Sequence, residues 1–186
     1  MLQQPDLLTP RLHLRPFTEK DASEVSRLAG DPAISQFTLD IPYPYDQITA
    51  QNWIRGLAIS SDEGTEIIYA ITLRDKGILL GAIGLMKIDT RNERARVGYW
   101  IGLPYWNKGY ATEALASILG YGFRVKGLNR INAYFMTENR ASGRVLEKCG
   151  MRYEGTMRQH IRKGDRYKDI AVYGILREDY TTPVPD

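Results

Sequence analysis

Residues 97–114 read VGYWIGLPYWNKGYATEA, and this stretch decides the fold. Apolar residues run to Ile101, a turn containing Pro104 and Gly109 follows, and small and apolar residues then recur at helical spacing. The pattern predicts a strand that passes through a tight turn into a helix. Because the first amides of a helix lack intrahelical partners and its dipole adds positive potential, this junction is suited to binding a pyrophosphate.

Composition and charge narrow the class of protein. The 186 residues are 43% hydrophobic and 25% charged, which predicts one globular domain over 1–186 with its core at about 8–176. The net charge of +3 suits one polyanionic small molecule and gives no argument for nucleic acid. Cys149 is the only cysteine, so an intrachain disulfide is excluded. Without a signal-peptide pattern or an apolar run of about 20 residues, we expect a cytoplasmic protein with no membrane partner.

The rest of the chain alternates between strand and helix patterns. Strands are predicted at 11–15, 67–73, 79–88, 96–103, 130–135, 151–161 and 168–176. Helices are predicted at 18–30, 47–60, 110–126 and 141–148, and the proline-containing segment 40–45 is predicted to be a loop. The order indicates the α+β class: an antiparallel-rich sheet with one strand–helix–strand crossover between Val97 and Phe135.

The residues around Gly109 exclude two common phosphate-binding turns. A P-loop places Lys and then Ser or Thr directly after its glycine, but Lys108 precedes Gly109, and the dinucleotide pattern Gly-x-Gly-x-x-Gly is absent. Residues 106–111, WNKGYA, instead resemble the acyl-CoA signature of the GNAT acetyltransferase superfamily, Arg/Gln-x-x-Gly-x-Gly/Ala. Trp106 stands where that signature has Arg or Gln. This departure resembles the RimJ/RimL branch of ribosomal-protein N-acetyltransferases, in which Gly-Lys-Gly-Tyr-Ala-Thr-Glu-Ala is typical.

Two further segments carry the same resemblance. Residues 9–16, TPRLHLRP, resemble the first strand of the branch, and 139–151, NRASGRVLEKCGM, resemble its Asn-x-x-Ser…Leu-Glu-Lys-x-Gly-Phe segment. The resemblance runs in order from about Leu8 to Leu176. It implies the GNAT fold, in which a mostly antiparallel, mixed sheet of seven strands splays between its fourth and fifth strands and about four helices flank it.

The resemblance implies acetyl-CoA as the co-substrate. Gly109 has no Cβ to block a pyrophosphate, and the amides of 107–112 can face one concavity. In this family the pantetheine arm lies between the splayed strands, which puts backbone groups near Ile101 and Leu103 on the arm and on the thioester carbonyl. The expected cofactor-binding residues are Ile101, Leu103, Asn107, Lys108, Gly109, Tyr110, Ala111, Thr112, Asn139 and Ser142. Gly109 as an ordinary turn glycine and Asn139 as a helix cap stay open as alternatives.

The implied reaction is acetyl transfer to a primary amine. An α-amine with a pKa near 8 is about one-tenth neutral at pH 7, whereas a lysine near 10.4 is only about 1/2500 neutral. A site with weak acid–base groups therefore favours a protein or peptide N-terminal amine. The site looks weakly equipped, because Glu147 stands where many members have a general-acid tyrosine and Arg96 stands where the branch often has Glu.

Ser142 and Asp169 are the catalytic candidates that remain. Ser142 could relay a proton to the leaving sulfur, and Asp169 or Glu154 could orient the amine or a water. Each also has a structural alternative: a serine in the first turn of a helix, or a carboxylate paired with arginine.

No metal is expected, because His13 and His160 lack companions at ligand spacing. Cys149 has no base near it in the sequence and is expected to pack at a helix end.

Two other functions stay open. One is acetylation of a polyamine or an amine antibiotic, although the segment 31–46 offers only Asp31, Asp40 and Asp46 to an acidic groove. The other is a CoA-binding sensor or interaction module without turnover. The resemblance admits a ribosomal-protein N-terminus as the acceptor, and the sequence is compatible with either a monomer or a homodimer.

Overall fold

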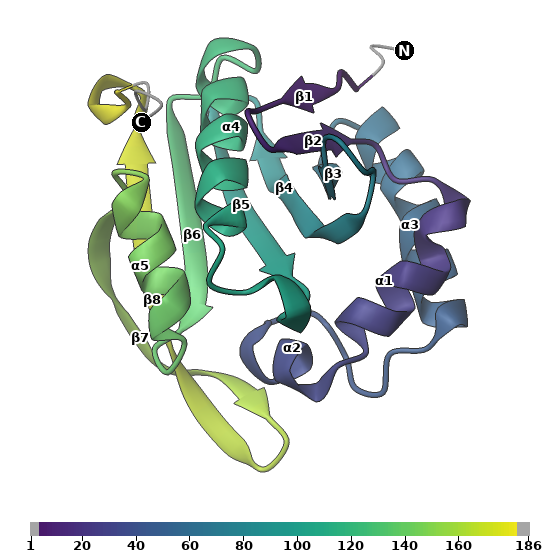
Figure 1. The fold of residues 1–186 in the computed structure, drawn as a ribbon. Helices are drawn as coiled ribbons and strands as arrows, with labels where there is room; N and C mark the ends of the chain where they lie inside the picture. The colour runs from purple at the N-terminus through teal and green to yellow at the C-terminus, as the bar shows by residue number, and fades with distance from the viewer. Residues whose placement is uncertain (1–3, 182–186) are drawn as a thin grey trace.

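The computed structural model describes residues 4–181, and a single eight-stranded sheet runs through them (Figure 1). The strands are β1 (Leu7–Leu8), β2 (Leu12–Arg15), β3 (Ile67–Leu73), β4 (Leu79–Asp89), β5 (Arg94–Ile101), β6 (Arg130–Met136), β7 (Arg152–Lys163) and β8 (Arg166–Leu176). Their order in the sheet is β1-β2-β3-β4-β5-β6-β8-β7, antiparallel throughout except for β5 and β6. The predicted α+β class and mostly antiparallel mixed sheet are confirmed. The sheet has one strand more than the seven expected because the two-residue β1 pairs with β2.

Helices flank the sheet where the sequence pattern placed them, with one addition. They are α1 (Ala22–Ala29), α2 (Pro32–Phe37), α3 (Gln47–Asp62), α4 (Tyr110–Arg124) and α5 (Arg140–Lys148). The added helix, α2, has six residues and begins where the Asp31 side chain accepts a hydrogen bond from the Ala33 amide, with Pro32 in the first turn. So short a helix gives no apolar periodicity in the sequence.

The core forms two clusters, one on each face of the sheet. Tyr69 and Ile71 of β3 pack in the cluster that contains the buried residues of α4, whereas the intervening Ala70 packs in the cluster of α1 and α3. This division follows from the alternation of side chains along a strand. Helices α4 and α5 are therefore anchored in one cluster and α1 and α3 in the other, whereas α2 contributes to neither.

The parallel pair β5–β6 separates part-way along its length. Its register runs from Arg94↔Arg130 to Val97↔Ala133 and stops there, although β5 continues to Ile101 and β6 to Met136. The outer edges stay paired, because β4 pairs with β5 as far as Ile101 and β8 pairs with β6 as far as Met136. Figure 1 shows the two strands diverging. The expected splay is thus present, and the inner edges of both strands face a gap.

The junction between β2 and α1 is held by a buried carboxylate. Asp21 accepts hydrogen bonds from Arg15 at 2.7 and 2.8 Å and from the amide and hydroxyl of Thr18 at 2.8 and 3.0 Å. Burial by itself raises the pKa of Asp21, but the bonds from Arg15 and Thr18 outweigh it and hold that pKa below its usual range. The charged form of Asp21 therefore stabilises the entry to α1.

Asp21→Asn should lower the free energy of unfolding by about 2 kcal/mol at pH 7, because it removes the charge that Arg15 faces. Since the folded pKa of Asp21 is depressed, its contribution is complete above the unfolded pKa near 3.9 and is lost as the pH falls through the folded value. Urea denaturation at pH 7 and pH 3 should therefore show the difference from wild type shrinking in acid. The exposed Asp75→Asn is the control, and a gap that is independent of pH would contradict this account.

Candidate active site

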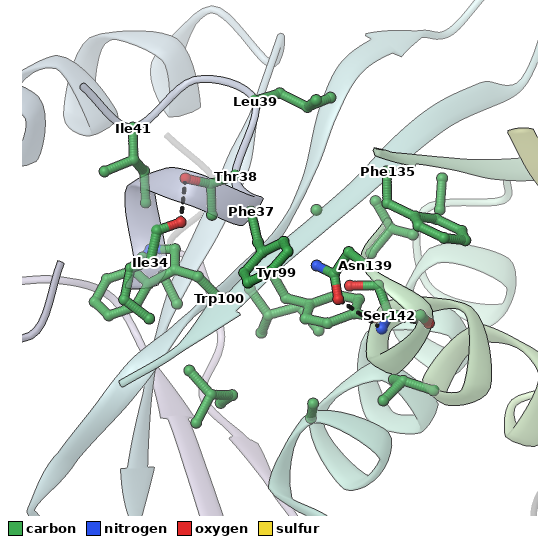
Figure 2. A pocket seen from close by; sticks show the side chains of 18 of the residues that line it. Ile34, Phe37, Thr38, Leu39, Ile41, Tyr99, Trp100, Phe135, Asn139 and Ser142 are labelled. Atoms are coloured by element: carbon green, nitrogen blue, oxygen red, sulfur yellow. Dashed lines mark hydrogen bonds between the residues drawn. The ribbon is translucent and has the colours of Figure 1, made fainter. Parts of the chain in front are cut away.

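A cleft of about 1220 Å³ occupies the gap between β5 and β6 (Figure 2). One end, which we call the turn side, is bounded by residues 107–112 and by α5. The other end, the α2 side, is bounded by α2 and by the segment 38–42 that follows it. Strand β5 contributes to both ends, so one strand connects the two halves of the cleft.

The turn side is formed by an unusual backbone path. Asn107 and Gly109 both have left-handed backbone conformations, with φ of 60° and 78°, and Gly109 is the N-cap of α4. The Glu113 amide donates to the Gly109 carbonyl at 3.1 Å, whereas within residues 4–181 no hydrogen bond joins the amides of 107–112 to another group. These amides line the cleft at the positive end of the helix dipole. The arrangement is suited to bind a phosphate group through backbone alone.

Contacts with the segment between β1 and β2 support the turn from outside. The Arg11 guanidinium donates to Glu113 at 2.6 Å and to the carbonyl of Lys108 at 3.0 Å, and it lies 5.0 Å from the ring centroid of Tyr110. Thr9 donates to the same Glu113 carboxylate at 2.6 Å. Burial raises the pKa of Glu113, but the hydrogen bonds from Thr9 and Arg11 outweigh it and lower that pKa. The charged pair thus fixes the turn against the sheet.

Trp106 ties the turn to the end of β5. Its indole Nε1 donates to the carbonyl of Ile101 at 2.5 Å. Trp106 occupies the signature position where Arg or Gln is usual. In this chain the residue at that position forms a hydrogen bond with the last residue of β5. The three tryptophans of the chain, Trp53, Trp100 and Trp106, all line the cleft.

Asn139 and Ser142 meet at the start of α5. The Asn139 Oδ1 accepts a hydrogen bond from the Ser142 amide at 3.2 Å, which is the capping role held open above. Its amide nitrogen points away from Ser142 and into the cleft (Figure 2). The Tyr99 hydroxyl donates to the Ser142 carbonyl at 3.3 Å, and burial raises the pKa of Tyr99. The start of α5 therefore places both Asn139 and Ser142 among the residues that line the gap.

Most of the expected site residues come together in this cleft. Those lining it are Ile101, Asn107, Lys108, Gly109, Tyr110, Ala111, Thr112, Asn139 and Ser142. Leu103 begins the short helix η2 (Leu103–Tyr105) and is not among the lining residues; it is 43% exposed.

The carboxylates proposed from the sequence lie elsewhere. Asp169 is on β8, where it accepts a hydrogen bond from the Gln159 amide at 2.7 Å and so supports an irregularity in β7. Glu154 is paired with Arg130 at 2.7 Å. Neither Asp169 nor Glu154 is among the residues lining the cleft.

Glu147, at the family's tyrosine position, accepts from the Tyr173 hydroxyl at 2.9 Å and also lies outside the lining. Of the acid–base candidates, Ser142 is the one that lines the cleft.

Sequence reasoning missed most of the α2 side. Apolar and aromatic residues dominate it, among them Ile34, Phe37, Leu39, Ile41, Tyr45, Trp53 and Trp100. From the sequence, Phe37, Tyr43 and Tyr45, which lie between the first two predicted helices, are candidates either to line an acceptor groove or to pack in an interface or core; Phe37 and Tyr45 line the cleft, and Tyr43 is not among the lining residues. The Asp31–Pro32 start signal could have located α2, but the contact of the segment after it with β5, Asp40 to Arg96, joins residues distant in sequence.

Cys149 packs as expected from its position at the end of α5. Its sulfur lies 3.5 Å from the Thr112 carbonyl, and burial raises the pKa of the thiol to about 11. Among residues 4–181 there is no group of three or more His, Cys, Asp or Glu side chains placed to hold a metal ion. No helix in that range is long and apolar enough to cross a membrane.

Comparison with known proteins identifies the family. The domain family described as "Acetyltransferase (GNAT) domain" matches residues 11–152. The chain belongs to the GNAT acetyltransferase family. This GNAT chain is 33% identical over 174 residues to the uncharacterized N-acetyltransferase YoaA of Bacillus subtilis, covering 93% of this chain and 97% of the relative.

Solved structures agree with this assignment. A GNAT-family acetyltransferase from Bacillus anthracis has a TM-score of 0.81 at 30% identity, covering 94% of this chain and 99% of that one. RimJ of Mycobacterium smegmatis, solved with CoA-disulfide, has a TM-score of 0.83 at 25% identity, covering 94% and 87%. The GNAT and RimJ/RimL-like resemblance is confirmed, and the chain is an N-acetyltransferase of a family that uses acetyl-CoA.

Gly109→Val should weaken acetyl-CoA binding by about tenfold or more, because misplacing the turn loses charge-assisted hydrogen bonds to the pyrophosphate. The φ of 78° strains any β-branched residue, and a Cβ there would lie 3.3 Å from the Arg11 guanidinium. Gly77→Val is the matched control, since Gly77 has φ of 65° in the β3–β4 turn with open space around it. Titration calorimetry of both variants tests this. The same loss of affinity in both variants, or no loss in either, would contradict binding of the pyrophosphate by this turn.

Proposed function

We propose that this enzyme transfers the acetyl group of acetyl-CoA to a primary amine, with preference for the α-amine of a protein or peptide N-terminus. The observation that carries the proposal is the cleft itself. At one end it presents unpartnered amides at a helix N-terminus, and between β5 and β6 it exposes two unpaired strand edges. The first suits a pyrophosphate and the second an extended arm rich in amides.

The cofactor lies along this path in the proposal. Its pyrophosphate is bound by the amides of 107–112, and its pantetheine arm extends along the open edge of β5, from Ile101 toward Gly98. The Asn139 amide nitrogen donates to the arm from α5. Leu103 is left out, because it is not among the residues lining the cleft. The thioester then lies near Val97 and Ala133, where the pairing of β5 with β6 ends, on the α2 side of Ile101.

The chemical step needs little from the protein in this arrangement. The neutral amine attacks the thioester carbonyl carbon, the C–N bond forms, and the C–S bond breaks. A backbone N–H on the open β5 edge stabilises the developing oxyanion, a contribution of about 3 kcal/mol for one such donor. The Ser142 hydroxyl gives its proton to the leaving sulfur and is reprotonated by solvent, while the new amide loses its extra proton to water.

Ser142 is the only one of the catalytic candidates from the sequence that lines the cleft, beside the carboxylates Asp40, Glu66 and Glu138, and this favours an acceptor amine that is easily deprotonated. An α-amine needs roughly 3 kcal/mol less help than a lysine to reach its neutral form at pH 7. Ser142 is neither a base nor charged, and Asp169 and Glu154 lie outside the cleft lining. A ribosomal-protein N-terminus is one acceptor of this kind.

An assay of CoA thiol release tests the proposed activity. A lysine-free peptide with an open N-terminus should be acetylated about 250-fold faster at pH 7 than the same peptide with a blocked N-terminus and one lysine, following their neutral fractions. The rate should rise with pH until the α-amine is deprotonated near pH 8. Tight acetyl-CoA binding without CoA release from any amine would favour the sensor alternative.

Ser142→Ala should lower kcat by about 100-fold if this hydroxyl protonates the sulfur. The dissociation constant of acetyl-CoA should change far less than kcat, since the amides of 107–112 remain. Ser142→Thr keeps a hydroxyl and should restore part of the rate. Steady-state kinetics beside calorimetry separate these effects, and an unchanged kcat in the alanine variant would remove Ser142 from the mechanism.

A further inference from the structure

Arg96 lies on β5 among the residues that line the cleft, and its donors are poorly satisfied. Its side chain is 17% exposed, and its Nε is buried with no hydrogen-bond partner within residues 4–181. The contacts it does make are long: 3.5 Å to the Asp40 carboxylate, 4.0 Å to the Met86 sulfur, and 6.0 Å to the ring centroid of Tyr134. A guanidinium has five N–H donors, and leaving them unpaired in a buried site is costly. An added acceptor of hydrogen bonds would therefore meet donors that the described residues leave unused.

Asp40 is a weak partner for this guanidinium. Its side chain is 77% exposed, and it lies in the segment that follows α2, where packing does not hold it. Exposed ion pairs of this kind contribute little. The Asp40 carboxylate therefore approaches Arg96 without saturating it, and a ligand carboxylate can take its place.

Charges of both signs surround Arg96. Lys87 lines the cleft beside Met86. Lys163, at the tip of the β7–β8 hairpin, donates to the Ser35 carbonyl of α2 at 3.0 Å; burial lowers the pKa of Lys163 and the nearby Asp40 charge opposes that shift. The charged side chains that line this side are Arg96 and Lys87 together with Asp40 and Glu66, so no excess of negative charge opposes a carboxylate there.

We propose that Arg96 binds a carboxylate of the acceptor, so that the enzyme selects amines carrying a carboxylate close to the reacting nitrogen. This rests on the acetyl transfer proposed above. A guanidinium binds a carboxylate through two parallel hydrogen bonds, which its buried Nε and outer nitrogens can supply. The apolar and aromatic walls of the α2 side strengthen that pairing by excluding water.

The position of Arg96 along β5 sets the spacing. The open edge of β5 begins at Gly98, two residues from Arg96, and successive residues in a strand rise about 3.3 Å. An amine attacking a thioester near Gly98 would therefore have its carboxylate within roughly 7 Å. That distance suits either a short amino acid, through its own carboxylate, or a peptide with an acidic second residue.

Matched acceptors test the proposal and separate these two sources. One arm compares C-terminally amidated peptides that differ only by Glu or Gln at the second position. The other compares a short ω-amino acid with its amide, corrected for the neutral fraction of each amine. The carboxylate member of at least one pair should have a KM lower by about 10- to 100-fold, and the arm that responds names the source.

Variants of Arg96 and of Asp40 should change KM for the carboxylate acceptor in opposite directions. Arg96→Gln should abolish the preference by raising KM for the carboxylate acceptor about 10- to 100-fold, with little change for the amide acceptor or in the Kd of acetyl-CoA. Arg96→Lys keeps the charge without the planar fork and should fall between. The exposed Asp40→Asn removes the competing carboxylate and should lower KM for the carboxylate acceptor.

The outcomes distinguish this inference from the function on which it rests. Equal KM values for carboxylate and amide acceptors, with CoA released from both, would overturn the role of Arg96 and leave acetyl transfer intact. A rise in KM for the carboxylate acceptor in Asp40→Asn would also overturn it. Absence of CoA release from every amine would overturn both proposals.

Discussion

The end of pairing between β5 and β6 is the constraint on which the rest of the site depends. Two neighbouring strands can diverge inside a sheet only if their outer edges stay paired, and β4 and β8 supply that pairing over the full separated length. The inner edges then carry backbone donors and acceptors that the protein leaves to water or to a ligand. The cleft is thus a consequence of sheet topology, and unpaired backbone groups of β5 and β6 form part of its walls.

The two ends of the cleft are anchored by different contacts. At the turn side, α4 buries one face in the core while its N-terminus faces the cleft, and the Arg11–Glu113 pair fixes the turn from outside. At the α2 side, a six-residue helix and the segment after it carry side chains such as the exposed Asp40. The turn side, which would bind the co-substrate, is held by the core and by an ion pair. The α2 side, which would bind the acceptor, depends less on such contacts, so its sequence can vary at little cost to the fold.

The sequence predicted the turn side in detail because its determinants are local. A strand, a glycine turn and a helix follow one another within residues 97–114, and each leaves a periodic or compositional signal. The α2 side leaves no such signal, since α2 is short and its surroundings are joined to the rest of the molecule by contacts between residues far apart in sequence, such as Lys163 to Ser35 and Arg96 to Asp40. Asp169 shows the same limit. Its bond to the Gln159 amide depends on the register of β7 against β8, and spacing along the chain does not reveal that register.

The placement of the tryptophans has an optical consequence. All three indoles of the chain line the cleft, with Trp106 bonded to the strand end at the turn side and Trp53 and Trp100 among the aromatic residues of the α2 side. Indole emission therefore originates at the walls of the cleft, with no tryptophan elsewhere in the chain to add a constant background. The intrinsic fluorescence of the unlabelled protein is a direct reporter of what fills each half, and replacing one indole at a time assigns the signal to its half.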